Sequence, residues 1–219
     1  MFGFKQFTKK DLEIKLSLDE IRKRARILVI DDDEKAFPYK LLQKEGYNIH
    51  YWKQVEKLKD LESGEYDLII LDIAGVAKAI STTDGLGVLE HLKKHNPAQL
   101  IIAYSGQKYD LSKSSFWDLA DDYLGKPSDL ISCKTKIDAL LKDHYTPKRY
   151  WLEVEKTLQN ANISEKELKK FGDRIFPSLR EGKKPSAETI QRYVNIGSES
   201  LTILNTLFQI IIRFFTPAP

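Results

Sequence analysis

The sequence predicts an α/β fold, in which a doubly wound, five-stranded parallel sheet is followed by an all-α extension. Short apolar runs with β-branched residues alternate with helical patterns from residue 27 to residue 145. This alternation is typical of a parallel sheet that helices cover on both faces. Beyond residue 146 only helical patterns follow. The chain therefore divides into an N-terminal extension (1–26), an α/β domain (27–145) and a helical region (146–219).

Five short runs are the expected strands. Each run is apolar, or alternates between apolar and polar residues, and ends at a polar or turn-forming residue. The expected strands are residues 27–30, 47–52, 66–72, 100–104 and 122–124. The spacing of apolar residues between and after them predicts helices around 37–42, 55–61, 85–95, 112–119 and 127–141.

Residues 1–26 allow two interpretations. Apolar residues at positions 12, 14, 16 and 18 alternate with polar ones, which predicts a strand. Ser17 and Glu20 have the spacing of a capping box, which predicts a short helix ending near Arg26 instead. Both interpretations stay open.

The composition is that of a soluble globular protein, with 219 residues of which 42% are hydrophobic and 31% charged. Cys133 is the one cysteine, which excludes an intramolecular disulfide and a multi-cysteine metal site. The first residues lack the apolar core of a secretory signal, so we expect a cytoplasmic protein. Residues 27–145 carry 20 acidic and 15 basic side chains, whereas both ends are net basic. This distribution favours a cation-binding core over a uniform nucleic-acid-binding surface.

The helical region contains several helix starts. Pro147 opens a first helix, and Ser164 with Glu167 forms a capping box ahead of a second. Ser186 caps a third helix, which we expect to break or bend near Gly197.

The last run, residues 201–215, has its polar residues in one narrow stripe and is otherwise apolar. At about 1.5 Å per residue, a helix over residues 201–215 would be about 22 Å long. This is shorter than the roughly 30 Å hydrocarbon core of a bilayer, so we expect no membrane span. A helix this apolar must be covered either by its own domain or by a second copy of the chain. A homodimer through residues 146–219 is therefore one of two open outcomes.

Polar residues stand at the ends of four of the five predicted strands. They are Asp31 and Asp32 after the first strand, Asp72 at the end of the third, Ser105 after the fourth and Lys126 after the fifth. Any one of them alone is more simply a turn, cap or surface residue, but the carboxyl ends of a doubly wound sheet share one edge, where ligands bind. We therefore expect these side chains to meet.

This set of side chains has a definite chemistry. Crowded carboxylates repel one another, and a hard divalent cation such as Mg²⁺ relieves the repulsion and accepts oxygen ligands. A carboxylate held beside that ion can attack phosphorus and form an aspartyl phosphate. Ser105 and Lys126 would then donate hydrogen bonds to the phosphoryl oxygens.

Five motifs occur in the order, and near the spacing, of one known family. They are Ile27-Leu28-Val29-Ile30-Asp31-Asp32-Asp33, Asp67-Leu68-Ile69-Ile70-Leu71-Asp72, Asp84-Gly85, Tyr104-Ser105-Gly106 and Ala120-Asp121-Asp122-Tyr123-Leu124-Gly125-Lys126-Pro127. On these motifs, the stretch from about Arg26 to Leu141 resembles a response-regulator receiver domain of bacterial two-component signalling. The resemblance covers just over half the chain and implies a flavodoxin-like sheet with strand order 2-1-3-4-5.

The resemblance implies a role for each site residue. Asp72 matches the phosphoacceptor. Asp31 and Asp32 match the acidic pair that binds Mg²⁺ together with Asp72, and the backbone carbonyl of Ala74 matches a further metal ligand. The phosphodonor would be a histidine kinase or a phosphotransfer protein, and the chain would be a switch with self-catalysed phosphoryl transfer rather than an enzyme.

Three more residues match the part of the family site that senses the phosphoryl group. Ser105 matches the hydroxyl that moves toward the phosphate, Tyr123 the aromatic switch residue that turns inward, and Lys126 the lysine that contacts the phosphoryl oxygens. The implied consequence is a shift between two populations of conformations, biased by a local charge.

The loop after Asp72 departs from the family pattern. Family members usually have a Met-Pro pair shortly after the phosphoacceptor, but here residues 73–83 lack it and the loop is about five residues longer before Asp84-Gly85. This insertion could gate access to Asp72, contact a partner or be a longer flexible loop.

Other functions fit parts of the same sequence. The loop insertion leaves open a receiver-fold scaffold that does not cycle phosphate. A DNA-binding transcription regulator would use basic residues of the helical region, namely Arg149, Lys169, Lys170, Arg174, Arg180, Lys183 and Lys184. That region shows no helix-turn-helix pattern, so nucleic-acid binding is not the expected outcome. A metal-dependent phosphatase has the least support, because no further acid/base group is evident.

Overall fold

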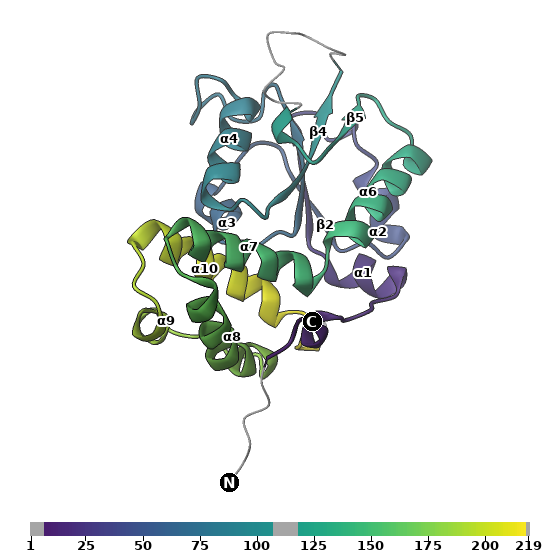
Figure 1. Ribbon diagram of the computed structural model, residues 1–219. Coiled ribbons are helices and arrows are strands. Elements are labelled where there is room, and N and C mark those ends of the chain that lie inside the picture. Colours follow the sequence, from purple (N-terminus) through teal and green to yellow (C-terminus); the bar gives the residue numbers. More distant parts are fainter. Residues whose placement is uncertain (1–6, 107–117, 218–219) are drawn as a thin grey trace. The chain divides into compact units, whose positions relative to one another are not determined.

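Five parallel strands form one sheet in the order β2-β1-β3-β4-β5 (Figure 1). The computed structural model describes residues 7–106 and 118–217. The strands are β1 (Ile27–Ile30), β2 (Ile49–Trp52), β3 (Leu68–Asp72), β4 (Leu100–Ser105) and β5 (Asp122–Gly125). The predicted fold class and strand order are confirmed.

Helices cover both faces of this sheet. They are α2 (Tyr39–Lys44), α3 (Leu58–Glu62), α4 (Gly85–His95) and α6 (Leu130–His144). Figure 1 shows α3 and α4 on one face and α2 and α6 on the other. The helix expected around 112–119 falls mostly outside the described residues.

Several predicted boundaries are wrong by a few residues. The third strand begins at Leu68 rather than Tyr66, because its pairing with β1 starts at the register pair Ile27 and Leu68. The second strand begins at Ile49 rather than Tyr47, because pairing with β1 starts at the register pair Ile27 and Ile49. The last helix of the sheet begins at Leu130 rather than Pro127, because Asp129 forms its N-cap and accepts a hydrogen bond from the Ser132 backbone N–H at 2.9 Å.

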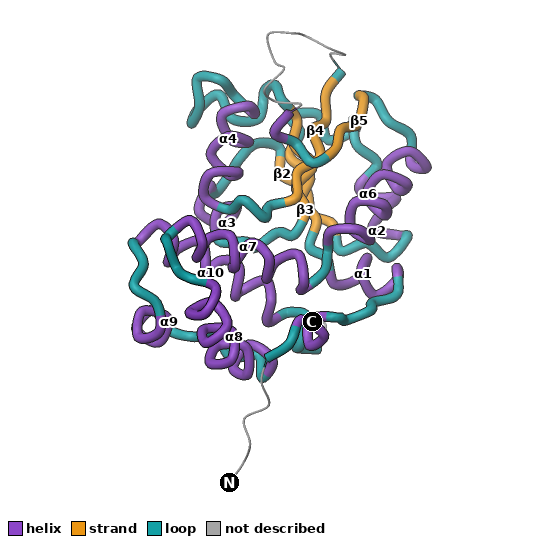
Figure 2. The backbone as a smooth tube through the Cα atoms, viewed as in Figure 1, coloured by secondary structure: helices purple, strands orange, loops and turns teal. Residues whose placement is uncertain are grey.

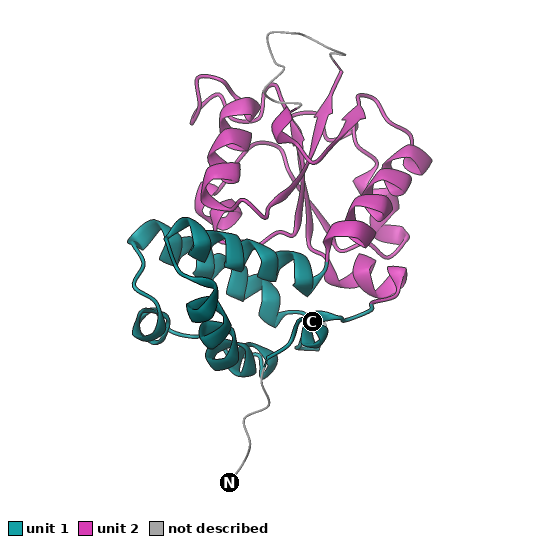
Figure 3. Ribbon diagram, viewed as in Figure 1, with its two compact units in different colours: residues 1–15, 146–219 teal, residues 16–145 magenta. Residues whose placement is uncertain are grey.

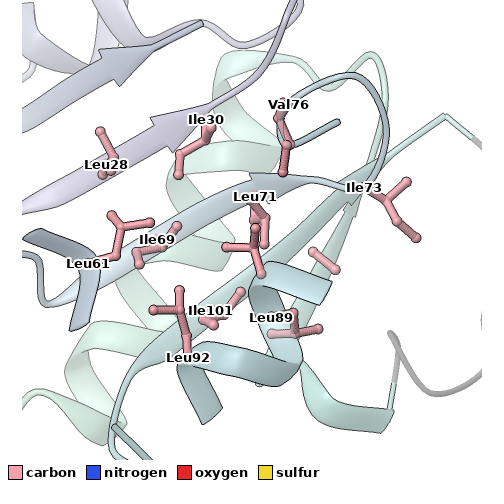
Figure 4. Packing of buried hydrophobic residues seen from close by; sticks show 13 residues of the cluster. Leu28, Ile30, Leu61, Ile69, Leu71, Ile73, Val76, Leu89, Leu92 and Ile101 are labelled. Atoms are coloured by element: carbon pink, nitrogen blue, oxygen red, sulfur yellow. The ribbon is translucent and has the colours of Figure 1, made fainter. Parts of the chain in front are cut away.

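Burial along the strands follows their position in the sheet. Every residue of β1, β3 and β4 is buried, whereas each of the edge strands β2 and β5 has one buried residue and is otherwise partly or fully exposed. One hydrophobic cluster joins β1, β3 and β4 to α3, α4 and the loop after β3 (Figure 4). The carboxyl ends of the central strands are thereby fixed on a rigid base.

The N-terminal extension is helical where it is described. It contains a short 3₁₀ helix, η1 (Lys9–Leu12), and α1 (Leu18–Arg24). Ser17 and Glu20 form the predicted capping box of α1, so that interpretation is confirmed. The strand interpretation is wrong, because Leu12 lies in the 3₁₀ turn and Leu18 in the first turn of the helix.

The chain separates into two compact units, drawn in different colours in Figure 3. One unit, residues 16–145, holds the sheet and α1, and we call it the sheet unit. The other combines residues 1–15 with 146–219, and we call it the helical unit. Within the helical unit, Phe7 contacts Trp151 and Phe176 with ring centroids 4.8 and 4.4 Å apart. The N-terminal extension is thus shared between the two units.

The described part of the helical unit contains no strand (Figure 2). Its α-helices are α7 (Pro147–Asn160), α8 (Glu165–Arg180), α9 (Ala187–Tyr193) and α10 (Ser198–Ile212). The predicted caps at Ser164 and Ser186 are present, and the chain breaks between α9 and α10 with Gly197 as the N-cap of α10.

The apolar helix α10 packs on α7, α8 and α9 of its own unit. Its buried residues include Leu204, Leu207 and Phe208, and the Phe208 ring stacks near Phe171 of α8. Thr206 of the predicted polar stripe is also buried. Burial of α10 therefore needs no second copy of the chain. None of the described helices combines the length and the apolar composition that a membrane span requires.

A pH dependence of stability is expected from Asp67, just before β3. Its carboxylate is buried and accepts a hydrogen bond from the Arg26 backbone N–H at 2.8 Å. Burial raises the pKa of Asp67 from 3.8 to about 7. Since the folded-state pKa is the higher one, the stability that this group contributes is present below about pH 4 and is lost as the pH rises through about 7.

Asp67→Asn keeps an acceptor for the Arg26 N–H but cannot ionise. We expect the free energy of unfolding of the variant to rise relative to wild type between pH 4 and pH 8, measured by urea denaturation at several pH values. A difference between the two proteins that does not change with pH would contradict this prediction.

Candidate functional site

Three aspartates meet at the carboxyl edge of the sheet. β1 and β3 are neighbours and pair Ile30 with Leu71, so the residues that follow, Asp31 and Asp72, lie side by side. One carboxylate oxygen from each of Asp31, Asp32 and Asp72 lies within 4.8 Å of the other two. Asp31 and Asp72 are buried and Asp32 is exposed. The arrangement therefore opens to solvent on the Asp32 side.

Lys126 provides the counter-charge for two of these carboxylates. Its Nζ donates to Asp31 Oδ1 and to Asp72 Oδ2, at 2.8 Å in each case. Burial opposes the charge on this ammonium and lowers its pKa, but the hydrogen bonds that it donates to Asp31 and Asp72 outweigh burial, so the pKa of Lys126 is raised. The ammonium is therefore charged and shared between two strand ends.

One oxygen of Asp31 is left over in this arrangement. Asp31 Oδ2 is buried and accepts no hydrogen bond from any described residue. Burial raises the pKa of the Asp31 carboxyl, although the hydrogen bond from Lys126 opposes that effect. A buried carboxylate oxygen without a donor is costly unless a cation or water satisfies it. With two further carboxylates close by, the donor set fits a hard, oxygen-binding divalent cation such as Mg²⁺.

Two other predicted site residues, Ser105 and Ala74, lie next to Lys126 and Asp72 in the fold. Ser105 is buried at the end of β4, and its carbonyl accepts a hydrogen bond from the Lys126 backbone N–H at 2.9 Å. Ala74 is exposed beside Asp72, and its N–H lies 3.3 Å from Asp72 Oδ1. The Ala74 carbonyl as a metal ligand stays a prediction.

Tyr123 does not join the cluster. Its side chain is 52% exposed, and the Lys136 ammonium lies 4.8 Å from its ring centroid. The same ammonium pairs with Asp122 at 2.6 Å. This outward position is the one from which an aromatic switch would turn inward, but that movement stays a prediction.

The loop after Asp72 is tied to the sheet unit at several points. The Asp84 carboxylate accepts hydrogen bonds from the backbone N–H groups of Gly75 and Ala77, both at 2.6 Å. Val76 is buried, and its carbonyl accepts from the Val55 N–H at 2.8 Å. The first half of the inserted loop, at residues 75–77, is therefore anchored to Val55 and to Asp84, which directly follows the loop.

Gly75 brings this loop against the acidic cluster. Its φ is +91°, which favours glycine, and a Cβ added there would lie 2.3 Å from Asp32 Oδ2. Only a residue without a side chain can approach Asp32 so closely. The sequence alone does not indicate this contact, because a glycine in an inserted loop is typical of any turn.

Two tyrosines outside the predicted site hold the loop after β1. The Tyr51 hydroxyl donates to the Asp31 carbonyl, and the Tyr104 hydroxyl donates to the Ala36 carbonyl. Burial raises the pKa of Tyr104 to about 12, so its hydroxyl stays a donor at neutral pH. A tyrosine inside an otherwise aliphatic buried strand was the available signal for Tyr104.

Residues 27–138 match the response regulator receiver domain family. The chain belongs to this family. The match covers just over half of the chain, and the observed strand order is the order that the resemblance implied. The receiver domain lies within the sheet unit, and the helical unit lies outside the matched residues.

Relatives of the receiver domain include named regulators. The chain is 33% identical over 122 residues to the transcriptional activator protein IrlR of Burkholderia pseudomallei, covering 53% of this chain and 50% of that protein. It is 26% identical over 140 residues to the transcriptional regulatory protein CpxR of Escherichia coli, covering 63% and 56%. The chain thus spans about half the length of the curated relatives it matches.

Solved structures overlap with the chain over a similar length. A two-component response regulator from Clostridium difficile is 26% identical, with a TM-score of 0.45 over 54% of this chain and 97% of that one. The response regulator TrrA from Thermotoga maritima, solved with Mg²⁺ and BeF, is 33% identical, with a TM-score of 0.42 over 53% and 99%.

Replacing Asp84 tests whether its carboxylate holds the inserted loop. Asp84→Ala removes the acceptor for two backbone N–H groups while leaving the strained positive φ of 54°. We expect the free energy of unfolding to fall by about 1 to 3 kcal/mol, the cost of leaving such donors without a partner. Urea denaturation measures the change.

Lys78→Ala is the matched control, because Lys78 is exposed in the same loop. It should leave the unfolding midpoint within a few tenths of a kcal/mol of wild type, as surface substitutions commonly do. Equal stability of the two variants would show that Asp84 does not hold the loop.

Proposed function

We propose that this chain is a response regulator that accepts a phosphoryl group on Asp72 in a Mg²⁺-dependent manner and signals through its helical unit. The observation that carries this proposal is the meeting of Asp31, Asp32, Asp72 and Lys126 at one sheet edge. The family match supports it independently.

Each residue has a task in the proposed reaction. A carboxylate oxygen of Asp72 attacks phosphorus, the new O–P bond forms, and the N–P bond to the donor histidine breaks, leaving its electron pair on nitrogen. The Lys126 ammonium donates hydrogen bonds to the phosphoryl oxygens, and the Ser105 hydroxyl donates a further one. Asp31, Asp32 and Asp72 would hold the Mg²⁺, which neutralises charge on the phosphoryl group.

The partner proposed for this step is a histidine kinase or a phosphotransfer protein. The chain itself would be a phosphoacceptor switch rather than an enzyme, because the described site offers no acid/base group beyond those that bind metal and phosphate. A cytoplasmic location follows from this partnership and stays part of the proposal.

The helical unit is the proposed output. Since α10 is covered within its own unit, a homodimer through residues 146–219 no longer has the support of an uncovered apolar helix. DNA binding is the second candidate. Lys166, Lys170 and Arg174 are exposed at i, i+4 and i+8 of α8, so they share one face, and IrlR and CpxR are named as transcriptional regulators.

Phosphorylation is tested by intact mass after incubation with a small phosphodonor and Mg²⁺. We expect the full chain to gain one phosphoryl mass and Asp72→Ala to gain none. A wild type that gains no mass, or an Asp72→Ala variant that gains it equally, would contradict the proposal.

Two substitutions in one acidic run serve as test and matched control. Asp32→Asn removes a charge from the cluster and should raise the Mg²⁺ concentration needed for half-maximal phosphorylation. Asp33→Asn removes a neighbouring charge whose side chain accepts only the Lys35 N–H in the described contacts, at 2.9 Å, and should leave that concentration unchanged.

For the DNA-binding candidate, the salt dependence of DNA retardation is decisive. Each phosphate contact contributes a slope of about −0.9 to a plot of log affinity against log salt. Lys170→Ala combined with Arg174→Ala should therefore make the slope less steep by about two, whereas Lys44→Ala in the sheet unit should not. Binding that is absent, or insensitive to salt and to the double substitution, would remove this candidate.

A further inference from the structure

Tyr104 is the strand neighbour of the proposed phosphoacceptor. In the register of β3 and β4, Asp72 pairs directly with Tyr104, so both side chains leave the sheet on the same face. Tyr104 is fully buried, with 0% of its surface exposed. Its ring therefore lies inside the domain next to the acidic site, and not at the solvent-exposed edge of the site.

The hydroxyl of Tyr104 reaches the loop that carries two of the carboxylates. It donates to the carbonyl of Ala36, in the segment between β1 and α2. The edge of the Phe37 ring packs against Tyr104, with centroids 5.2 Å apart and planes at 88°. This fixes the far end of the loop that begins with Asp31 and Asp32.

The ring of Tyr104 faces the cation of the site. Lys126 Nζ lies 5.6 Å from the ring centroid, within range of a cation–π interaction. The same ammonium holds Asp31 and Asp72 at 2.8 Å. One side chain thus contacts both the acidic loop and the ammonium that neutralises it.

We propose that Tyr104 is a positioning residue of the phosphoacceptor site: its hydroxyl fixes the Asp31–Asp32 loop for Mg²⁺, and its ring fixes the Lys126 ammonium for the phosphoryl group. This inference rests on the proposed function of Asp72. A loop held in place before the ion arrives loses less conformational freedom on binding, and a lysine held in place is closer to the geometry that transfer requires.

Tyr51 supports the same loop differently. Its hydroxyl donates to the Asp31 carbonyl at 2.5 Å, at the start of the loop, and its ring stacks on Tyr39. It has no described contact with Lys126. Of these two tyrosines, Tyr104 is therefore the one that contacts both the loop after β1 and the Lys126 ammonium.

Two substitutions separate the two parts of the role in the full-length chain. Tyr104→Phe removes the hydroxyl and keeps the ring, so the Mg²⁺ dissociation constant should rise about threefold to tenfold, the range for loss of one hydrogen bond. The phosphorylation rate at saturating Mg²⁺ should stay near wild type. Tyr104→Leu removes the ring as well, so that rate should also fall about twofold to fivefold.

Mg²⁺ binding is followed by tryptophan emission without phosphodonor, because the Trp52 carbonyl accepts the Asp31 N–H at 3.1 Å and Trp52 therefore adjoins the site. Phosphorylation is followed by intact mass with a small phosphodonor. Tyr47→Phe is the matched control, because it removes a buried tyrosine hydroxyl that donates to Asp138, away from the acidic cluster. It should change neither the Mg²⁺ dissociation constant nor the rate.

The outcomes separate the inference from the function on which it rests. A wild type that neither binds Mg²⁺ nor gains phosphoryl mass overturns both. A wild type that does both, with a Tyr104→Phe variant whose Mg²⁺ affinity equals that of wild type, overturns the positioning role alone. The positioning role is also overturned if Tyr104→Phe and Tyr47→Phe weaken Mg²⁺ binding equally. The weakening would then come from general destabilisation.

Discussion

The ammonium of Lys126 lies between two buried carboxylates that belong to different strands, and the site depends on this pairing. Asp31 and Asp72 would repel each other if both were ionised without a counter-charge. Lys126, just after β5, satisfies both at 2.8 Å and so couples the ends of three strands electrostatically. Asp31 Oδ2 and the exposed Asp32 keep oxygen ligands available on the open side.

Around this charged centre, hydrogen bonds from tyrosine hydroxyls and to the Asp84 carboxylate hold the backbone of the two loops that carry it. Tyr51 and Tyr104 fix the loop after β1 at its two ends. Asp84 fixes the loop after β3, and Gly75 lets that loop approach Asp32. The loops stand on central strands that are buried at every position, so the carboxylates are carried by the most rigid part of the receiver domain. Preorganisation of this kind is what binding a small, strongly hydrated ion requires.

Much of this could be predicted from local patterns. The strand Ile27–Ile30 was predicted to the residue, and the end of β3 at Asp72 was also predicted, because burial on both faces leaves a continuous apolar signal, although the start of β3 was placed two residues too early. The edge strand β2 was placed two residues too early, because its residues alternate and its start is decided by pairing with β1. The alternation near Leu12 was misleading, because a short polar–apolar pattern does not distinguish a strand from successive helical turns.

The sequence by itself determined which chemical groups stand at the strand ends, because strand order and chain order fix where Asp31, Asp72 and Lys126 emerge. It also determined the fold class and the helical character of residues 146–219. Only the tertiary structure decided that Tyr104 lies beside Asp72, that Gly75 touches Asp32, and that α10 is covered by α7, α8 and α9. These contacts join residues far apart in the chain or across an irregular loop, and their geometry depends on packing that no local spacing records.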